Sequence, residues 1–336
     1  MKIVHFHNPG SPDIAEYKGM FAENGIEFVQ YIGSRSPEEM IAACEGADAI
    51  VTCILPFTRE IIEKLPDSVK CIVRSAMGYE IIDVDACSER GILVCNIPDY
   101  AMEEVAMHQI ALIMALCRKL RHYDHAIRRG EWQKPGYLSG YECRRISSLT
   151  IGLLGFGRIA KRVAKAMLAM GAAVCTYDPF LSKETVESYG VQYCATKEEV
   201  LEHSDVISPN IPLMESSFHI IDADAIAKMK QDVIIVNTGR GGLVDTEALI
   251  RGIESGKIGA AGLDVYEEEN ANVYRDRSAE VFTSVTSRLC SFPNVVMTSH
   301  QAFFTHEALS QIAHVTLENA QAYADGTDFV DRSVVC

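Results

Sequence analysis

Hydrophobic positions in the second half of the chain follow the order strand, turn, helix, strand. The apolar run Leu149–Leu154 has the length of a strand, and the turn sequence Gly-Phe-Gly-Arg-Ile-Ala follows it at 155–160. Apolar residues then recur every three or four positions over 159–170, which is the spacing of one helix face. A second apolar run at 172–177 ends in Asp178. We therefore predict a β–α–β unit that opens on a glycine-rich turn.

The residues of this turn suit a dinucleotide. Gly155 permits a tight turn, and Gly157 lacks a side chain where a pyrophosphate must approach the backbone. The helix that follows offers free N–H groups and the positive end of its dipole to the phosphates. A carboxylate at Asp178 can accept hydrogen bonds from ribose hydroxyls and repel a 2′-phosphate. The combination predicts binding of NAD in preference to NADP, whereas a glycine-rich turn alone would fit any α/β domain.

Residues 1–99 alternate short apolar runs with stretches of helical spacing, which is typical of a small parallel α/β domain. Ser36-Pro37-Glu38-Glu39 predicts a helix start, with Ser36 as the N-cap and Glu39 closing a capping box. The loop Arg74–Glu80 follows a predicted strand, where Gly78 either presents N–H groups to an anion or serves a turn. The predicted strands are Ile3–Phe6, Glu27–Ile32, Ala49–Leu55, Lys70–Arg74 and Ile92–Asn96, and the predicted helices lie near 13–24, 37–45, 58–64 and 83–90.

The rest of the chain continues this alternation after one long hydrophobic stretch. Residues Glu103 to Gly130 contain no proline and are apolar on almost all faces, so we expect a single helix, buried in the core or in a subunit interface. Pro209 inside the run Val206–Ile211 indicates that this strand ends early or lies at an edge. A polar, irregular stretch follows Asp264. Six strands are predicted over 149–299, the other three at 233–237, 258–264 and 295–299, and helices at 222–229, 245–256 and 305–325.

Composition and charge exclude several classes of protein. A length of 336 residues allows two domains, and the net charge of −15 argues against a surface for nucleic acid or anionic membrane. The first ten residues contain no long apolar segment, so we expect no signal peptide, and no apolar run is long enough to span a membrane. The eleven cysteines are scattered without a C-x-x-C pair. We therefore expect no metal site and a reduced, cytoplasmic protein.

Three chemically capable residues follow predicted strands in the second half: Arg240, Glu269 and His300. Each of the three also has a purely structural interpretation. Arg240 would bind a backbone carbonyl at a turn, Glu269 would belong to a solvated acidic run, and His300 would be a hydrogen-bonded polar residue at a strand end. Because the carboxyl ends of parallel strands share one edge of a sheet, we expect the three to converge on a ligand. Arginine binds a carboxylate, and a histidine beside a carboxylate exchanges a proton near neutral pH. Beside a nicotinamide, this set predicts reduction of a 2-keto acid. Other histidines are interpreted as surface residues: His122, His125 and His219.

Along nearly all its length the chain resembles the D-isomer-specific 2-hydroxyacid dehydrogenase family. The stretches that carry the resemblance are Arg74–Asp83, Gly152–Ala160, Val236–Asp245, Gly262–Glu267 and Pro293–His300. The resemblance implies an α/β fold with a Rossmann doubly wound NAD domain at 100–299. It also implies a discontinuous, flavodoxin-like substrate domain made of 1–99 and 300–336, with the active site in the cleft between the two. Members of the family are usually homodimers built through their NAD domains, which suits the helix expected at 103–130.

The resemblance also assigns roles to individual residues. It implies that Arg240 binds the substrate carboxylate and carbonyl, that His300 is the acid and base, and that Glu269 is its partner. The other substrate-binding residues that it implies are Arg74, Met77, Gly78, Tyr100 and Phe303. The implied NAD-binding residues are Gly155, Gly157, Arg158, Ile159, Asp178, Ile211, Pro212, Ser217, Thr238, Gly239 and Asp264.

In the sequence, His300 follows Glu269 by 31 positions. This separation resembles that of the D-lactate and D-2-hydroxyisocaproate dehydrogenases, which have a long insert between the two residues. This branch implies a small 2-keto or 2-hydroxy acid as substrate, and Glu269 argues against formate dehydrogenases, which lack that partner. Two alternatives stay open: an NAD-sensing binding protein like the corepressors of the family, and a dehydrogenase of a phosphorylated or larger 2-hydroxy acid. The chain departs from the family pattern at Met107, Pro209 and Asn210.

Overall fold

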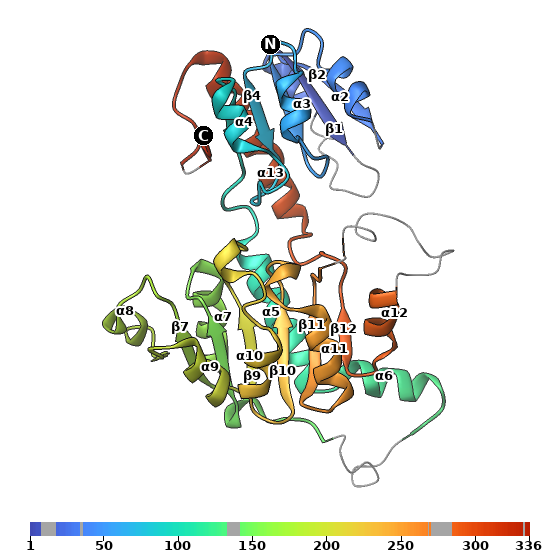
Figure 1. The fold of residues 1–336 in the computed structure, drawn as a ribbon, viewed down its shortest axis with the longest axis vertical. Helices are drawn as coiled ribbons and strands as arrows, with labels where there is room; N and C mark the ends of the chain where they lie inside the picture. Colours follow the sequence, from blue (N-terminus) through green and yellow to red (C-terminus); the bar gives the residue numbers. More distant parts are fainter. Residues whose placement is uncertain (8–17, 34–35, 133–141, 268, 270–283, 332) are drawn as a thin grey trace. The chain divides into compact units, whose positions relative to one another are not determined.

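The computed structural model describes residues 1–7, 18–33, 36–132, 142–267, 269, 284–331 and 333–336. Within these residues the chain forms two compact units, one made of Met1–Ala101 with Phe304–Cys336 and the other running from Met102 to Phe303 (Figure 1). His300 belongs to the second unit because its backbone N–H donates to the Asp264 carbonyl, at 2.7 Å. The boundary drawn from the sequence, between 299 and 300, had placed it in the first.

The first unit is built on a five-stranded sheet in which all strands are parallel, in the order β2-β1-β3-β4-β5. This is the flavodoxin-like order that the resemblance implied. Strand β1 lies between β2 and β3, and Ile3 pairs with both Phe28 and Ala49. The strands are β1 (Lys2–His7), β2 (Glu27–Ile32), β3 (Ala49–Thr52), β4 (Cys71–Arg74) and β5 (Leu93–Cys95).

The helices of the first unit begin where the sequence offers N-caps. Ser36 and Glu39 form the predicted capping box, and Asp83 and Thr305 each accept a backbone N–H at the start of a helix. The C-terminus joins this unit through β5, because the Val94 N–H donates to the Cys336 carbonyl, at 3.0 Å. The helices are α1 (Lys18–Glu23), α2 (Pro37–Ala43), α3 (Arg59–Glu63), α4 (Val84–Glu89) and α13 (His306–Asp325).

The second unit is built on a seven-stranded parallel sheet in the order β12-β11-β10-β9-β6-β7-β8. The chain direction across the sheet reverses between β6 and β9, which is the switch point where doubly wound folds bind nucleotides. The strands are β6 (Thr150–Leu154), β7 (Ala173–Tyr177), β8 (Gln192–Tyr193), β9 (Val206–Pro209), β10 (Val233–Asn237), β11 (Ile258–Leu263) and β12 (Val295–Met297).

Both faces of this sheet are buried, so its strands read as continuous apolar runs rather than alternating ones. Ile234 and Val236 pack into a core with α5 and α7, whereas Val233 and Ile235 pack into a second core on the opposite face. The helices are α5 (Met102–Cys117), α6 (Leu120–Arg128), α7 (Arg158–Ala169), α8 (Lys183–Glu187), α9 (Lys197–His203), α10 (Ala223–Lys228), α11 (Thr246–Glu254) and α12 (Ser284–Ser291). Across the described segments, no helix has the length and apolar character needed to cross a bilayer.

Three sequence predictions about this unit are corrected. The single helix expected over 103–130 is two helices, because Lys119 adopts a left-handed conformation, φ 52°, between α5 and α6. The sheet has a seventh strand, β8, and the stretch after Asp264 that was predicted to be irregular contains α12. Strand β9 does end early, at Pro209, but it lies between β6 and β10 and not at an edge.

Candidate active site

The glycine-rich turn joins β6 to α7 at the switch point of the sheet. Gly155 has φ +90°, and a Cβ there would lie 2.7 Å from the Asn210 carbonyl oxygen and against the Ile211 side chain. Gly157 has an ordinary φ of −74°, and a Cβ there would meet nothing within 4 Å. The first glycine is therefore required by the protein itself, whereas the second leaves open space beside the start of α7.

The start of α7 differs from that of most other helices in the chain. Gly157 is its N-cap and has no side chain to accept the free N–H groups. In α2, α4, α8, α9, α10, α11 and α13, a Ser, Thr or Asp side chain fills that place. The first turn of α7 also contains no acidic residue. An anion such as a pyrophosphate fits this helix end, because it can accept the N–H groups and interact with the helix dipole.

Asp178 follows β7, next to the glycine-rich turn. Its Oδ2 accepts the Phe156 N–H at 2.8 Å, and its Oδ1 accepts the Phe180 N–H at 2.9 Å. The carboxylate thus fixes the turn from the side on which a ribose is expected, and each of its oxygens keeps a further lone pair.

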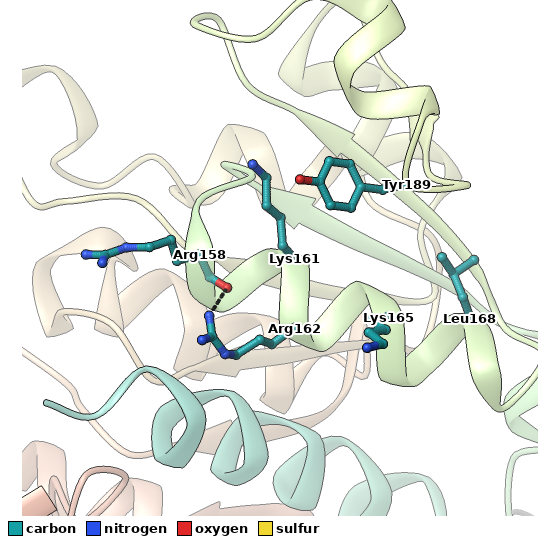
Figure 2. Close-up of a pocket in the computed structure, with 6 residues that line it drawn as sticks. All are labelled: Arg158, Lys161, Arg162, Lys165, Leu168 and Tyr189. Atoms are coloured by element: carbon teal, nitrogen blue, oxygen red, sulfur yellow. Dashed lines mark hydrogen bonds between the residues drawn. The ribbon is translucent and has the colours of Figure 1, made fainter. Parts of the chain in front are cut away.

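Basic side chains line a groove along α7. The groove has a volume of about 440 Å³ and is lined by Arg158, Lys161, Arg162, Lys165, Leu168 and Tyr189. Figure 2 shows the four cationic groups spread along the helix rather than meeting at one point, with Lys161 pointing toward the Tyr189 ring. Of these residues, Arg158 lies nearest in sequence to the glycine-rich turn. The groove therefore supplies diffuse positive charge beside that turn and not a convergent anion site.

Arg240 lies in the loop after β10, and the neighbouring loop after β11 packs against it. A Cβ at Gly241 would lie 2.7 Å from the Glu267 N and in closer contact with the Tyr266 carbonyl group. The Asn237 side chain holds the loop, since it donates to the Arg240 carbonyl at 2.8 Å and accepts the Gly239 N–H at 3.1 Å. Glycine at 241 lets the two loops touch, and this contact brings the arginine toward the loop that carries Glu269.

His300 and Glu269 are brought into contact. His300 Nδ1 lies 3.1 Å from Glu269 Oε1, and the glutamate side chain is only 12% exposed. Because Nδ1 faces the carboxylate, the expected proton exchange with a substrate would take place at Nε2. The Phe303 ring lies edge-on to the imidazole, with 6.5 Å between centroids. Histidine, carboxylate and aromatic ring thus form one cluster after β11 and β12.

The turn that carries His300 is strained and is held by Asp264. Ser299 and His300 have φ values of 53° and 58°, in the left-handed region that costs non-glycine residues about 1–2 kcal/mol each. Asp264 is 2% exposed. Its Oδ1 accepts the Gln301 N–H at 2.8 Å, and its Oδ2 accepts the Ala302 N–H at 3.0 Å. Strain of this kind is retained where the surroundings enforce it, and it marks a functional position.

Two histidines in this region were missed as functional candidates. His108 of α5 lies 2.8 Å from the Thr298 hydroxyl, which donates to Asp264 at 2.6 Å. His219, interpreted from the sequence as a surface residue, is half-buried and lies 2.6 Å from Glu267. The second oxygen of that glutamate accepts the Thr246 N–H at 2.7 Å. No local signal identifies either contact, because the partners are far apart in sequence.

The remaining residues expected at the cofactor lie after β9 and β10. Ile211 packs beside Gly155, and Thr238 is buried with its hydroxyl 3.5 Å from the Gln109 side chain. Ser217 is also buried, and it uses its hydroxyl within its own turn, donating to the Pro212 carbonyl at 2.7 Å. Gly239 and Pro212 lie on the same two loops.

Four residues expected at the substrate belong to the first unit. Met77 and Gly78 follow β4, and the Asn96 side chain donates to the Met77 carbonyl at 2.7 Å. Arg74 ends β4, and its Nε and Nη1 are buried without an acceptor among the described residues. Tyr100 lines a pocket of about 230 Å³ with residues of α13. Their predicted contacts with substrate stay predictions.

The departures from the family pattern have local explanations in two cases. Leu154 pairs with Pro209, which has no N–H to donate. The Leu154 carbonyl instead accepts the N–H of the next residue, Asn210, at 2.7 Å. Met107 is 60% exposed on α5, so an acidic residue is not needed there for folding. Among the described residues, no group of three or more His, Cys, Asp or Glu side chains is placed to bind a metal ion.

The candidate residues follow one another along the carboxyl edge of the second sheet. Asp178 follows β7, the glycine-rich turn follows β6, Arg240 follows β10, Glu269 follows β11 and His300 follows β12. This order matches the order of the roles that the resemblance implies, from the ribose through the pyrophosphate to the acid–base pair. An extended dinucleotide laid across this edge would bring its far end to the histidine.

Comparison with known proteins agrees with this arrangement. Residues 110–302 match the NAD binding domain of D-isomer specific 2-hydroxyacid dehydrogenases. A 2-hydroxyacid dehydrogenase homolog of Schizosaccharomyces pombe is 41% identical over 268 residues, covering 79% of this chain and 78% of the relative. A D-lactate dehydrogenase of Curvularia clavata is 34% identical, covering 97% and 93%. The crystal structure of an Aquifex aeolicus D-lactate dehydrogenase, complexed with NAD and lactic acid, has a TM-score of 0.86 at 30% identity, covering 99% and 98%.

These matches span most of the chain and include both its sheets. They confirm the resemblance seen in the sequence, the α/β fold with two parallel sheets, and NAD as the cofactor. The chain therefore belongs to the D-isomer-specific 2-hydroxyacid dehydrogenases, NAD-dependent oxidoreductases that act on 2-hydroxy acids.

Proposed function

We propose that this enzyme reduces a small 2-keto acid to the D-2-hydroxy acid with NADH, as a D-lactate dehydrogenase does. The observation that carries the proposal is the 3.1 Å contact between His300 and Glu269 beside the loop of Arg240. A proton donor held by a carboxylate, together with a guanidinium, is the set that a keto acid needs. The D-lactate dehydrogenases among its relatives support the small substrate.

Each side chain has a distinct part in this proposal. Arg240 binds the substrate carboxylate and orients the carbonyl beside it. His300 donates the proton from Nε2 to the carbonyl oxygen as the alcohol forms, and takes it back in the reverse direction. Glu269 accepts from Nδ1, so it fixes the ring and stabilises the imidazolium. NADH, when bound, supplies the hydride.

Asp178 and the start of α7 would hold the cofactor. The N–H groups at Gly157 and Arg158 suit the pyrophosphate, and the Asp178 carboxylate suits the ribose hydroxyls. Ile159, Ile211, Pro212 and Thr238 would line the same path, and Gly239 lies beside Thr238. Ser217 would act by shaping the loop that holds Pro212. Asp264 would act through the His300 turn.

The test is NADH oxidation with pyruvate, 2-ketoisocaproate, phenylpyruvate, 2-oxoglutarate, hydroxypyruvate and glyoxylate, with NADPH in parallel. We expect fast turnover of at least one small keto acid with NADH, weak activity with NADPH and a D-configured product on a chiral column. The matched variant is Arg240→Lys, which keeps the charge but loses the bidentate fork and should raise the KM for the keto acid. Absence of turnover despite tight NADH binding would instead favour an NAD-sensing binding protein.

A substrate with a second acidic group is the alternative that one observation favours. A buried N–H group without an acceptor costs free energy. Within the described structure, Nε and Nη1 of Arg74 are two such groups. A carboxylate or phosphate on the substrate would satisfy them. If so, 2-oxoglutarate or a phosphorylated keto acid outperforms pyruvate, and Arg74→Gln lowers kcat/KM for that acid more than it lowers kcat/KM for pyruvate.

We also propose a homodimer formed through the second unit, in a reducing cytoplasm. Met107 on α5 is 60% exposed, and Leu120 and Ile127 of α6 are exposed as well, which is the kind of apolar surface that subunits bury. The eleven cysteines are free thiols, as a reducing compartment requires. Light scattering after size exclusion should give twice the 37.1 kDa chain mass, and Met107→Lys should shift the protein toward monomer.

A further inference from the structure

A polar chain runs from α5 to the turn that carries His300. His108 Nε2 lies 2.8 Å from Thr298 Oγ1, and this hydroxyl lies 2.6 Å from Asp264 Oδ1. His108 Nε2 also lies 3.6 Å from the same carboxylate oxygen. The His108 side chain is 24% exposed and that of Asp264 is 1% exposed, so water screens this chain poorly.

The direction of the hydrogen bonds in this chain follows from chemistry. The Thr298 hydroxyl has one proton, which it donates to the Asp264 carboxylate. Its oxygen must therefore accept from His108, so Nε2 is the protonated nitrogen of that ring. His108 is thus the first donor in a series of two hydrogen bonds that ends at the buried Asp264 carboxylate.

The same carboxylate determines the geometry of the catalytic turn. Asp264 accepts the N–H groups of Gln301 and Ala302 through its side chain and that of His300 through its backbone carbonyl. These bonds hold Ser299 and His300 in their left-handed conformations. Any shift of the Asp264 carboxylate therefore shifts the imidazole that meets the substrate.

We propose that His108 is a positioning residue for the catalytic histidine, acting through Thr298 and Asp264. It links α5, a helix that packs against α7 and against strands β10 and β11, to a turn that begins 190 positions later. The proposal rests on the dehydrogenase activity proposed above. It assigns His108 no contact with substrate or cofactor.

Substitutions can separate the donor from the bulk of the ring. His108→Gln keeps an N–H donor near the position of Nε2, whereas His108→Ala removes it. Thr298→Ser keeps the hydroxyl, whereas Thr298→Val replaces it with a methyl group of the same shape. His125→Ala is the control, because His125 is an exposed histidine on the adjacent helix α6.

The kinetic test measures kcat and KM with the preferred keto acid, and the deuterium isotope effect with 4-deuterated NADH. We expect His108→Ala and Thr298→Val to lower kcat by about 10- to 100-fold, since a small misplacement of a catalytic group costs that much. The isotope effect on kcat should rise, and the KM for NADH should stay within threefold. His108→Gln, Thr298→Ser and His125→Ala should remain within about threefold of the wild-type kcat.

Hydrogen exchange provides a readout that does not depend on turnover. In His108→Ala and Thr298→Val, a peptide covering 298–303 should exchange faster than in the wild type, while peptides of β6 and β10 are unchanged. A His108→Ala enzyme with wild-type kcat and unchanged exchange would overturn the assignment to His108 and leave the proposed activity intact. An inactive wild type would overturn the proposed activity, and the exchange result alone would then decide whether His108 holds the turn.

Discussion

At the scale of single residues, we propose that the His300–Glu269 pair carries the chemistry, and its charge can be tested separately from its geometry. Glu269 Oε1 lies 3.1 Å from Nδ1, and an amide oxygen can accept in the same place. Glu269→Gln should therefore keep the ring orientation but lose the charge that stabilises the imidazolium. We expect kcat for keto-acid reduction to fall at least about tenfold with little change in the KM for NADH. Wild-type turnover by this variant would exclude an electrostatic role for Glu269.

Asp178 tests cofactor choice at the same scale. Both its oxygens accept backbone N–H groups, and Asp178→Asn keeps one of these acceptors while removing the charge that repels a 2′-phosphate. The ratio of kcat/KM for NADH to that for NADPH should fall at least about tenfold. Initial rates with both cofactors measure this ratio directly. A ratio that does not change would mean that other residues discriminate against NADP.

At the scale of elements, the two glycines of the β6–α7 turn have separable roles. A Cβ at Gly155 collides with the Asn210 carbonyl and Ile211 at a φ of +90°, whereas a Cβ at Gly157 meets nothing within 4 Å. Gly155→Ala should lower the free energy of unfolding by about 1–3 kcal/mol, because strain and overpacking add. Gly157→Ala should leave the melting temperature unchanged and weaken NADH binding. Thermal denaturation and NADH fluorescence titration on both variants check this, and equal loss of stability in the two would contradict it.

Elements with strong local signals were predictable from the sequence. Strands β2 and β10 have the predicted bounds, and in β10 the apolar run lies between the polar residues Asp232 and Asn237. The break between α5 and α6 was not predictable, because the sequence around Lys119 carries no signal for a left-handed conformation. Strand β8 has two residues and is too short to show a pattern.

The candidate site divides in the same way. Arg240, Glu269 and His300 were predicted because strand ends and residue types are visible in sequence. The hydrogen bonds that link His108 through Thr298 to Asp264 were not predicted, because they depend on how α5 packs on the sheet.

At the scale of the whole molecule, burial controls thiol reactivity. Burial raises the pKa of Cys44 and Cys87 to about 12, and that of Cys117 to about 11. At pH 8, below these values, only about one Cys44 side chain in 10⁴ is a thiolate. Iodoacetamide should modify the exposed Cys290 of the native enzyme and spare these three, whereas all eleven react after unfolding. Rapid modification of Cys44 in the native protein, read by mass spectrometry, would contradict this account of the core.

The measurement that most directly tests the central claim compares His300→Ala with the wild type. NADH oxidation is followed with the preferred keto acid, and NADH affinity is measured on both proteins by fluorescence. We predict that kcat/KM for the keto acid falls about 10²- to 10⁴-fold while NADH binds with unchanged affinity, because the proton donor is lost and the cofactor site remains. A variant that turns over at the wild-type rate would contradict the assignment of His300 as the acid and base.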